Sequence, residues 1–306
     1  LGQDEVVGHN QTVYHVILQA KDRLGLYHLY RIVSDSHLNF FHMRPRIPRS
    51  LLTYYKAGLI VGSACERGEI FQSALNAYRS SYDVQQALQQ LRSPEALRLA
   101  RFYDYFEIQP LDNNAFYLRN PDSGLTTTED LQKINRVIFE WGRQMKKWVC
   151  ATGDVHFVNP DDEIYRRLLM HDMGYDDADQ PTDLSYKTTG EMLDAFAYLG
   201  ETNARMAVID HPAAIAAQIS ADLKPFPDGS FPPLIEQAAD EVRNLTWSAA
   251  LAVYGREGQV PETVRDRIER ELASIIENGF AVMYYISHKL VKKSNEDGYI
   301  VGSRGS

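Results

Sequence analysis

Short β-rich runs alternate with longer helical segments over the first half of the chain. The β-rich runs cover residues 12–18, 58–63, 103–108 and 148–152. Residues 22–36, 69–91 and 128–148 carry apolar side chains at helical spacing instead. This alternation is typical of parallel βαβ units. The sequence therefore predicts an α/β domain with a largely parallel sheet.

A change of character near residue 224 predicts a domain boundary. Residues 224–233 contain four prolines and a glycine, a composition typical of a linker. Beyond it the sequence predicts one helix from Pro261–Glu262 to Gly279 and a second over residues 280–294. A short strand over residues 299–301 and a Gly/Ser loop over residues 302–306 are predicted to follow.

Composition limits the classes of protein to which the chain can belong. The net charge of −9 excludes a surface that is basic throughout, but residues 31–49 carry an excess of arginine and residues 161–183 an excess of acids. Any nucleic acid would therefore have to bind to a local basic region of the surface rather than to the whole of it. No apolar run approaches the roughly 20 residues that span a bilayer. Two cysteines are too few for a disulfide framework, which favours the reducing cytoplasm.

Four polar side chains lie on or just after the predicted strands and suggest a metal site. Asp154 and His156 are two residues apart, so they share one face of an extended segment. Imidazole and carboxylate ligands suit zinc, manganese or iron. His15 and Cys65 likewise lie on or just after predicted strands. In a parallel α/β barrel, polar groups at the strand ends meet at the mouth of the barrel, which could gather all four. Taken singly, a strand histidine is usually a core or surface residue, and Cys65 a small buried hydrophobe.

Seven stretches carry a resemblance to a known family. They are YHVIL (14–18), PRIPRS (45–50), GSACERGE (62–69), ATGDVH (151–156), GFAV (279–282), ISHKLVKKS (286–294) and DGYIVGSRGS (297–306). In this order, and over essentially the whole chain, the sequence resembles the alpha subunit of PolC-type bacterial DNA polymerase III. The first residue is not Met and the last lies inside a Gly/Ser motif, so we expect an internal fragment.

The resemblance implies an architecture and a set of metal ligands. Residues 1–224 would be the C-terminal part of a PHP domain, a distorted (βα) barrel, following an inserted exonuclease. Residues 225–235 would be the linker, and residues 236–306 the largely helical N-terminal portion of a polymerase beta-like palm. His15, Cys65, Asp154 and His156 fall on metal-ligand positions of the family, which implies zinc or manganese there. The family's remaining ligands would precede residue 1.

In the family, Gly302, Ser303, Arg304, Gly305 and Ser306 belong to a nucleotide-binding loop. Glycine allows close approach of backbone N–H groups to a triphosphate, and serine and arginine add hydrogen bonds. On its pattern alone the motif is weak, because a Gly/Ser turn is usually just a turn.

Two basic clusters have two interpretations each. Lys289, Lys292 and Lys293 could contact DNA or could favour the dipole at a helix C-terminus. Arg44, Arg46 and Arg49 could serve a nucleic acid, or could pair with the acidic segment after His156.

The resemblance implies a segment of a replicative DNA-directed DNA polymerase. In the reaction a primer 3′ hydroxyl attacks the α-phosphate of a nucleotide, with magnesium as the cofactor. The catalytic aspartates would lie beyond Ser306, so no catalytic residue is expected here and the fragment alone would be inactive. The implied partners are primer–template DNA, dNTP, the sliding clamp and other replisome subunits. A membrane is not among them. The alternatives are a stand-alone PHP-type phosphoesterase and a non-catalytic, metal-stabilised scaffold.

Overall fold

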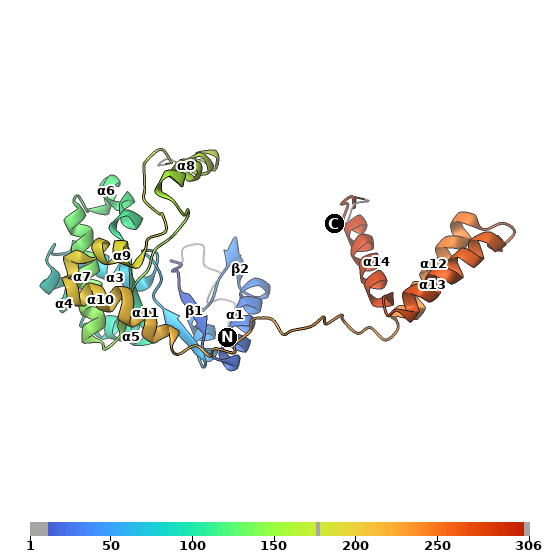
Figure 1. The fold of residues 1–306 in the computed structure, drawn as a ribbon, viewed down its shortest axis with the longest axis horizontal. Coiled ribbons are helices and arrows are strands. Elements are labelled where there is room, and N and C mark those ends of the chain that lie inside the picture. Colours follow the sequence, from blue (N-terminus) through green and yellow to red (C-terminus); the bar gives the residue numbers. More distant parts are fainter. Residues whose placement is uncertain (1–11, 176–177, 303–306) are drawn as a thin grey trace. The chain divides into compact units, whose positions relative to one another are not determined.

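The computed structural model describes residues 12–175 and 178–302. The chain divides into two compact units, Leu1–Pro225 and Phe226–Ser306 (Figure 1). The division falls within the proline-rich segment.

A four-stranded sheet lies at the centre of the first unit. Its strands have the order β1-β4-β5-β6, with β1 at Ile17–Ala20, β4 at Leu59–Gly62, β5 at Tyr105–Ile108 and β6 at Trp148–Ala151. β5 pairs in parallel with both β4 and β6. The strands predicted over residues 58–63, 103–108 and 148–152 are thus confirmed. A two-stranded hairpin joins β2 (Phe41–His42) to β3 (Arg44–Pro45).

The first strand differs from its prediction in position and direction. It covers Ile17–Ala20 rather than residues 12–18, and His15 contributes an isolated parallel bridge to Gly68. β1 is also antiparallel to β4, with Ile17 opposite Gly62, so this pair is the exception in a sheet that is otherwise parallel, as predicted. Two helices and a hairpin, rather than one crossover helix, connect these strands. The chain therefore returns in the opposite direction.

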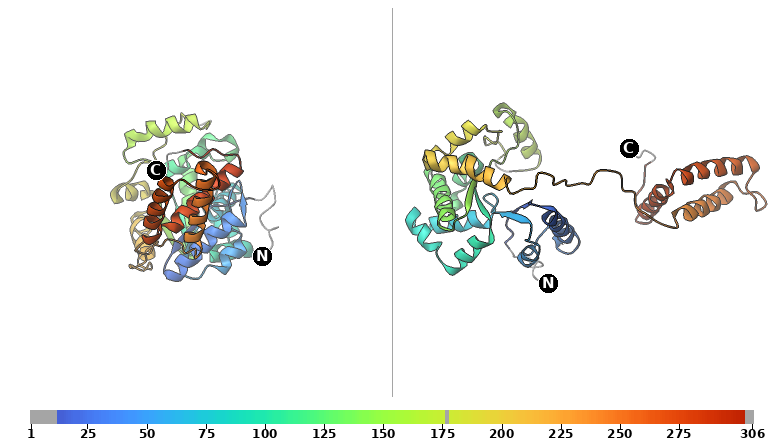
Figure 2. Two further views of the ribbon diagram at one scale, coloured as in Figure 1. Left: turned by 90° about the vertical axis from the view of Figure 1, so that its right-hand side faces the viewer. Right: turned by 60° about the horizontal axis from the view of Figure 1, so that its bottom comes forward.

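Helices surround the sheet, as Figures 1 and 2 show. The α-helices of the first unit are α1 (Arg23–Leu38), α2 (Arg49–Tyr54), α3 (Glu69–Arg79), α4 (Val84–Gln90), α5 (Pro94–Phe102), α6 (Phe116–Arg119), α7 (Thr128–Gln144), α8 (Glu163–Asp172), α9 (Thr189–Ala195), α10 (Glu201–Arg205) and α11 (His211–Ala216). One π-helical turn, Met206–Asp210, precedes α11. The helices predicted over residues 22–36, 69–91 and 128–148 are confirmed, the second as α3 and α4.

Both faces of the sheet are buried. Val61, Phe106 and Val149 enter the main hydrophobic core, to which α3 and α7 contribute. The residues next to them along the strands, among them Tyr105 and Cys150, enter a smaller cluster that includes Ile215 of α11. This two-residue alternation is the ordinary geometry of a strand. It determines which side chains of β5 and β6 can reach a common site.

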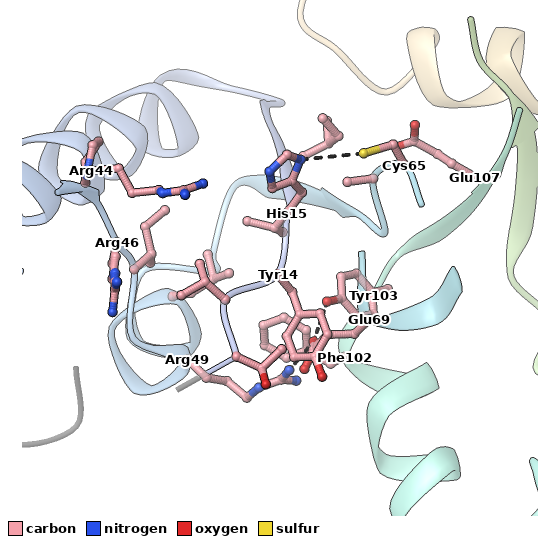
Figure 3. Close-up of a pocket in the computed structure, with 18 of the residues that line it drawn as sticks. Tyr14, His15, Arg44, Arg46, Arg49, Cys65, Glu69, Phe102, Tyr103 and Glu107 are labelled. Atoms are coloured by element: carbon pink, nitrogen blue, oxygen red, sulfur yellow. Dashed lines mark hydrogen bonds and ion pairs between the residues drawn. The ribbon is translucent and has the colours of Figure 1, made fainter. Parts of the chain in front are cut away.

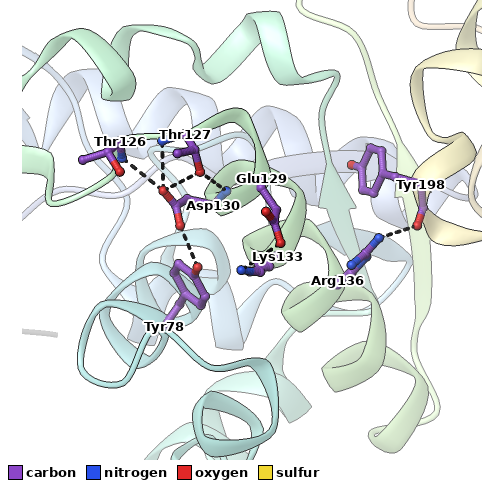
Figure 4. Close-up of polar contacts among 8 residues, drawn as sticks. All are labelled: Tyr78, Thr126, Thr127, Glu129, Asp130, Lys133, Arg136 and Tyr198. Atoms are coloured by element: carbon purple, nitrogen blue, oxygen red, sulfur yellow. Dashed lines mark hydrogen bonds and ion pairs between the residues drawn. The ribbon is translucent and has the colours of Figure 1, made fainter.

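A charged network holds the start of α7 (Figure 4). Thr127 and Asp130 form a capping box, in which each side chain accepts a hydrogen bond from the other's backbone N–H. The buried hydroxyl of Tyr78 donates to Asp130 Oδ1 at 2.8 Å. Burial raises the pKa of Asp130, but hydrogen bonds from Tyr78, Thr126 and Thr127 outweigh burial, and the pKa lies below its ordinary value.

Residues 226–302, the described part of the second unit, form three helices: α12 (Ala238–Tyr254), α13 (Glu262–Glu277) and α14 (Ala281–Glu296). α12 packs against both α13 and α14. Gly279, with φ of 76°, separates α13 from α14 in the left-handed conformation that glycine adopts without strain. Both predicted helices are confirmed.

The strand predicted over residues 299–301 is absent from the described chain. α14 ends in a turn in which Tyr299 N–H donates to Ser294 O at 2.9 Å, and no described strand lies opposite the segment to pair with it. None of the described helices is both long and apolar enough to cross a membrane.

Candidate metal centre

The polar residues of interest meet at one edge of the sheet. Cys65 follows the end of β4, and Thr152 and Asp154 follow the end of β6; because β4, β5 and β6 are parallel, their carboxyl ends share this edge. His15 precedes β1, which is antiparallel to β4, so the amino end of β1 lies at the same edge. The reversed direction of β1 therefore brings His15 to Cys65.

His15 and Cys65 form a close pair (Figure 3). The imidazole Nδ1 lies 3.5 Å from the Cys65 Sγ. The backbone N–H of His15 also donates to Arg67 O at 3.0 Å. This hydrogen bond holds the segment before β1 against the turn after β4. Burial raises the pKa of the Cys65 thiol to about 11. A metal ion bound to Cys65 would have to displace the thiol proton.

Asp154 and His156 form a second pair in an exposed segment. His156 Nδ1 lies 2.7 Å from Asp154 O and 3.9 Å from Asp154 Oδ2. Asp154 lines the same cavity as His15 and Cys65, whereas His156 is not among the residues that line it. Within residues 12–175 and 178–302, no three His, Cys, Asp or Glu side chains lie close enough to hold one ion.

The residue types of this set suit a divalent ion, and two of the four residues also lie close enough together to share one. Imidazole, thiol and carboxylate groups are zinc-type ligands, and the His15–Cys65 pair is compact enough for two of them to share an ion. The assignment of His15, Cys65, Asp154 and His156 as one ligand set stays a prediction.

Sequence reasoning missed Glu107. Its side chain is only 7% exposed and lines the cavity with His15, Cys65 and Asp154. Thr152 Oγ1 donates to Glu107 Oε2 at 2.9 Å, while Oε1 has no hydrogen-bond partner. Burial raises the pKa of Glu107, and polar groups of Thr152, Tyr105 and Ala64 oppose the rise. A glutamate within the apolar strand 103–108 was the signal that could have identified it.

Arginines line another part of this cavity, which has a volume of about 820 Å³. Arg44, Arg46 and Arg49 are all among its lining residues. Arg49 forms an ion pair with Glu69 and lies over the Phe102 ring at 4.5 Å from its centre. Arg49 is thus paired within the cavity rather than with the acidic segment after His156. The cavity therefore offers guanidinium groups near the thiol and carboxylates.

The lysines near the end of α14 are exposed and have local contacts. Lys289 lies over the Tyr285 ring at 4.9 Å. Lys292 lies 3.8 Å from Glu296 Oε1, and Lys293 2.6 Å from Asp297 Oδ2. Such exposed pairs contribute little to stability, so they leave the basic surface available to a partner.

Of the predicted nucleotide loop, the structure describes only Gly302. It is exposed and lies in no helix or strand. Ser303, Arg304, Gly305 and Ser306 lie outside the described residues.

Comparison with known proteins identifies the family. Residues 3–109 match the PHP domain, and residues 240–306 match the bacterial DNA polymerase III alpha NTPase domain. The PolC-type DNA polymerase III of Caldanaerobacter subterraneus subsp. tengcongensis is 48% identical over 100% of the chain. The corresponding proteins of Clostridium perfringens and Bacillus subtilis are 44% and 41% identical, each over 96% of it. The chain belongs to the PolC-type DNA polymerase III family.

The match covers only part of each relative. The chain spans about a fifth of their length: 21% of the Caldanaerobacter protein and 19% of the other two. His15 and Cys65 fall inside the PHP match and Asp154 and His156 outside it. The resemblance to PolC drawn from the seven motifs is confirmed, as is the α/β character of the first unit.

Proposed function

We propose that this chain is a segment of a replicative DNA-directed DNA polymerase. The observation that carries the proposal is the succession, in one chain, of a PHP match and a polymerase III alpha match, with 48% identity to a PolC-type enzyme over the whole length. In the complete polypeptide, a primer 3′ hydroxyl attacks the α-phosphate of a dNTP and pyrophosphate leaves. Magnesium supplies charge stabilisation to that reaction. Such an enzyme works on the chromosome, in the cytoplasm.

The two units have different tasks in this proposal. Residues 1–224 form the later part of the PHP domain, and residues 236–306, after the linker 225–235, begin the palm. Gly302, Ser303, Arg304, Gly305 and Ser306 hold the nucleotide triphosphate through backbone N–H groups, hydroxyls and a guanidinium. Lys289, Lys292 and Lys293 contact the phosphates of primer–template DNA. The sliding clamp and other replisome subunits are further partners.

The first unit binds a divalent cation, zinc or manganese, at the edge of its sheet. His15 and Cys65 supply an imidazole and a thiolate, and Asp154 and His156 complete the set in the complete polypeptide. The close contact of His15 with Cys65 and the shared cavity with Asp154 support this proposal. The ion supplies Lewis-acid and structural stabilisation when bound.

Primer extension by the complete polypeptide that carries this sequence tests the proposal. Wild-type protein should extend a primer with Mg²⁺ and dNTP. Arg304→Ala should raise the KM for dNTP by about tenfold, since a charge-assisted contact to phosphate contributes roughly 1.5–3 kcal/mol. Arg256→Ala, which removes an exposed arginine between α12 and α13, is the matched control and should not change KM. Absence of template-dependent extension by the wild type would refute the proposal.

A second candidate function is a metal-dependent phosphoesterase in the first unit. The observation that favours it is the cavity itself, which brings Arg44, Arg46 and Arg49 together with His15, Cys65 and Asp154. Guanidinium groups bind phosphate, and a metal ion can activate water. Hydrolysis of a phosphomonoester that Asp154→Ala abolishes would support this activity. Metal-dependent stability without hydrolysis would instead support a structural role for the ion.

A further inference from the structure

Glu107 differs from the other residues of β5, because its side chain is a carboxylic acid although the strand is buried. Tyr105, Phe106 and Ile108 are apolar or aromatic and buried, as expected for a central strand. Glu107 is equally buried, with 7% of its surface exposed. Its Oε1 meets no donor in good hydrogen-bond geometry among the described residues, although the Tyr105 hydroxyl and the Ala64 N–H lie near the carboxylate. An unpaired buried carboxylate oxygen is costly, so a positive group from outside the chain would relieve it.

The backbone and side chain of Glu107 connect the two turns that carry candidate ligands. Its N–H donates to Ser63 Oγ at 2.9 Å, and Ser63 lies two residues before Cys65. Its Oε2 accepts from Thr152 Oγ1 at 2.9 Å, and Thr152 lies two residues before Asp154. Glu107, Cys65 and Asp154 all line the same cavity, and Figure 3 labels Glu107 and Cys65 there. Glu107 therefore lies between the two turns and contacts both.

We propose that Glu107 is a positioning residue of the divalent-cation site. One carboxylate oxygen fixes the turn that leads to Asp154, and the other faces the bound cation and balances its charge. The proposal rests on the cation site proposed above. Because Oε2 already accepts a hydrogen bond from Thr152, Glu107 acts through its charge rather than as a direct ligand. Carboxylates in such positions tune metal affinity.

Cobalt titration of the complete polypeptide gives a spectroscopic test. Co²⁺ bound to a thiolate produces a charge-transfer band. Loss of this band in Cys65→Ser identifies it as due to the Cys65 thiolate. Glu107→Gln should weaken Co²⁺ binding at this band by about tenfold or more. Glu69→Gln removes a carboxylate of the same cavity that is already paired with Arg49, and should leave the affinity within about twofold.

Thermal melting distinguishes a role of Glu107 at the cation site from a role in the stability of the fold alone. Without metal, Glu107→Gln should melt at the wild-type temperature or higher, because it removes a buried charge. With Co²⁺ its rise in Tm should be smaller than that of the wild type. An unchanged cobalt affinity together with a lower metal-free Tm would overturn the proposal. If the wild type shows no band that depends on Cys65, the cation site fails as well; if the band is present but insensitive to Glu107→Gln, only the role of Glu107 fails.

Discussion

His15 Nδ1 lies 3.5 Å from Cys65 Sγ, although 50 residues separate the two in sequence. The contact depends on the antiparallel pairing of β1 with β4, which places the start of one strand beside the end of the other. A parallel first strand would have put these two ends at opposite edges of the sheet. The direction of an edge strand thus decides whether this part of the site can form.

The network at the start of α7 predicts a pH-dependent contribution to stability. Asp130→Asn should lower the free energy of unfolding by about 1.5–3 kcal/mol at pH 7, since the charged carboxylate accepts several hydrogen bonds. The pKa of Asp130 is lower in the folded state, so its stabilisation is complete above the unfolded pKa near ~4. It is lost as the pH falls through the folded pKa.

Urea unfolding at several pH values measures this effect. The difference between wild type and Asp130→Asn should be constant from neutral pH down to pH ~5 and shrink below pH ~4. Tyr82→Phe is the control, because the Tyr82 hydroxyl donates to the neutral Gly124 carbonyl at 2.9 Å. Its effect should not vary over this range. A difference for Asp130→Asn that grows on acidification would contradict the assignment.

The close packing of β4 against β5 makes Gly62 intolerant of a side chain. A Cβ at Gly62 would lie 2.3 Å from Tyr105 Cζ, and Tyr105 is buried. Gly62→Ala should therefore destabilise the first unit by about 1–3 kcal/mol. Gly190→Ala, where a Cβ meets no atom within 4 Å, should cause no loss. Equal melting temperatures for the two variants would show that the Tyr105 ring can move away from Gly62.

The basic end of α14 predicts a salt-dependent contact with DNA. Changing Lys289, Lys292 and Lys293 to Gln in the complete polypeptide should weaken primer–template binding. The slope of log K against log salt should become shallower by roughly 2–3, about 0.9 for each lost phosphate contact. The matched control replaces Arg265, Arg267 and Arg270 of α13 by Gln, with the same loss of charge.

The dissociation constant for a fluorescent primer–template, measured at several salt concentrations between roughly 50 mM and 200 mM, gives this slope. A lower melting temperature of the α14 variant with unchanged DNA affinity would favour the alternative interpretation, in which the lysines only stabilise the helix end. Equal loss in both variants would point to general electrostatics.

Local sequence patterns predicted the three parallel strands and several of the helices, because hydrophobic period and turn residues are local signals. The strands at β4, β5 and β6 and the helices α1, α7, α13 and α14 were predicted in this way. The direction of β1 could not be predicted, since it depends on how the two helices and the hairpin between β1 and β4 pack. A strand over residues 299–301 was predicted from β propensity alone, without a partner strand.

The candidate site could be predicted only in part. His15, Cys65 and Asp154 were identified by residue type and by their position at strand ends, and they line one cavity. Glu107 was not predicted, because it lies inside a strand rather than at a strand end. Its importance depends on three-dimensional neighbours, Ser63 and Thr152, that lie 44 and 45 residues away in sequence.

The central claim is that a divalent cation binds where His15 meets Cys65. Zinc-edge anomalous diffraction from crystals of the complete polypeptide grown with Zn²⁺ tests it most directly. The account predicts an anomalous peak within about 2.0–2.4 Å of His15 Nδ1 and Cys65 Sγ, the usual zinc–ligand distances, and no such peak in Cys65→Ser. Well-ordered density for both side chains without an anomalous peak between them would contradict the account.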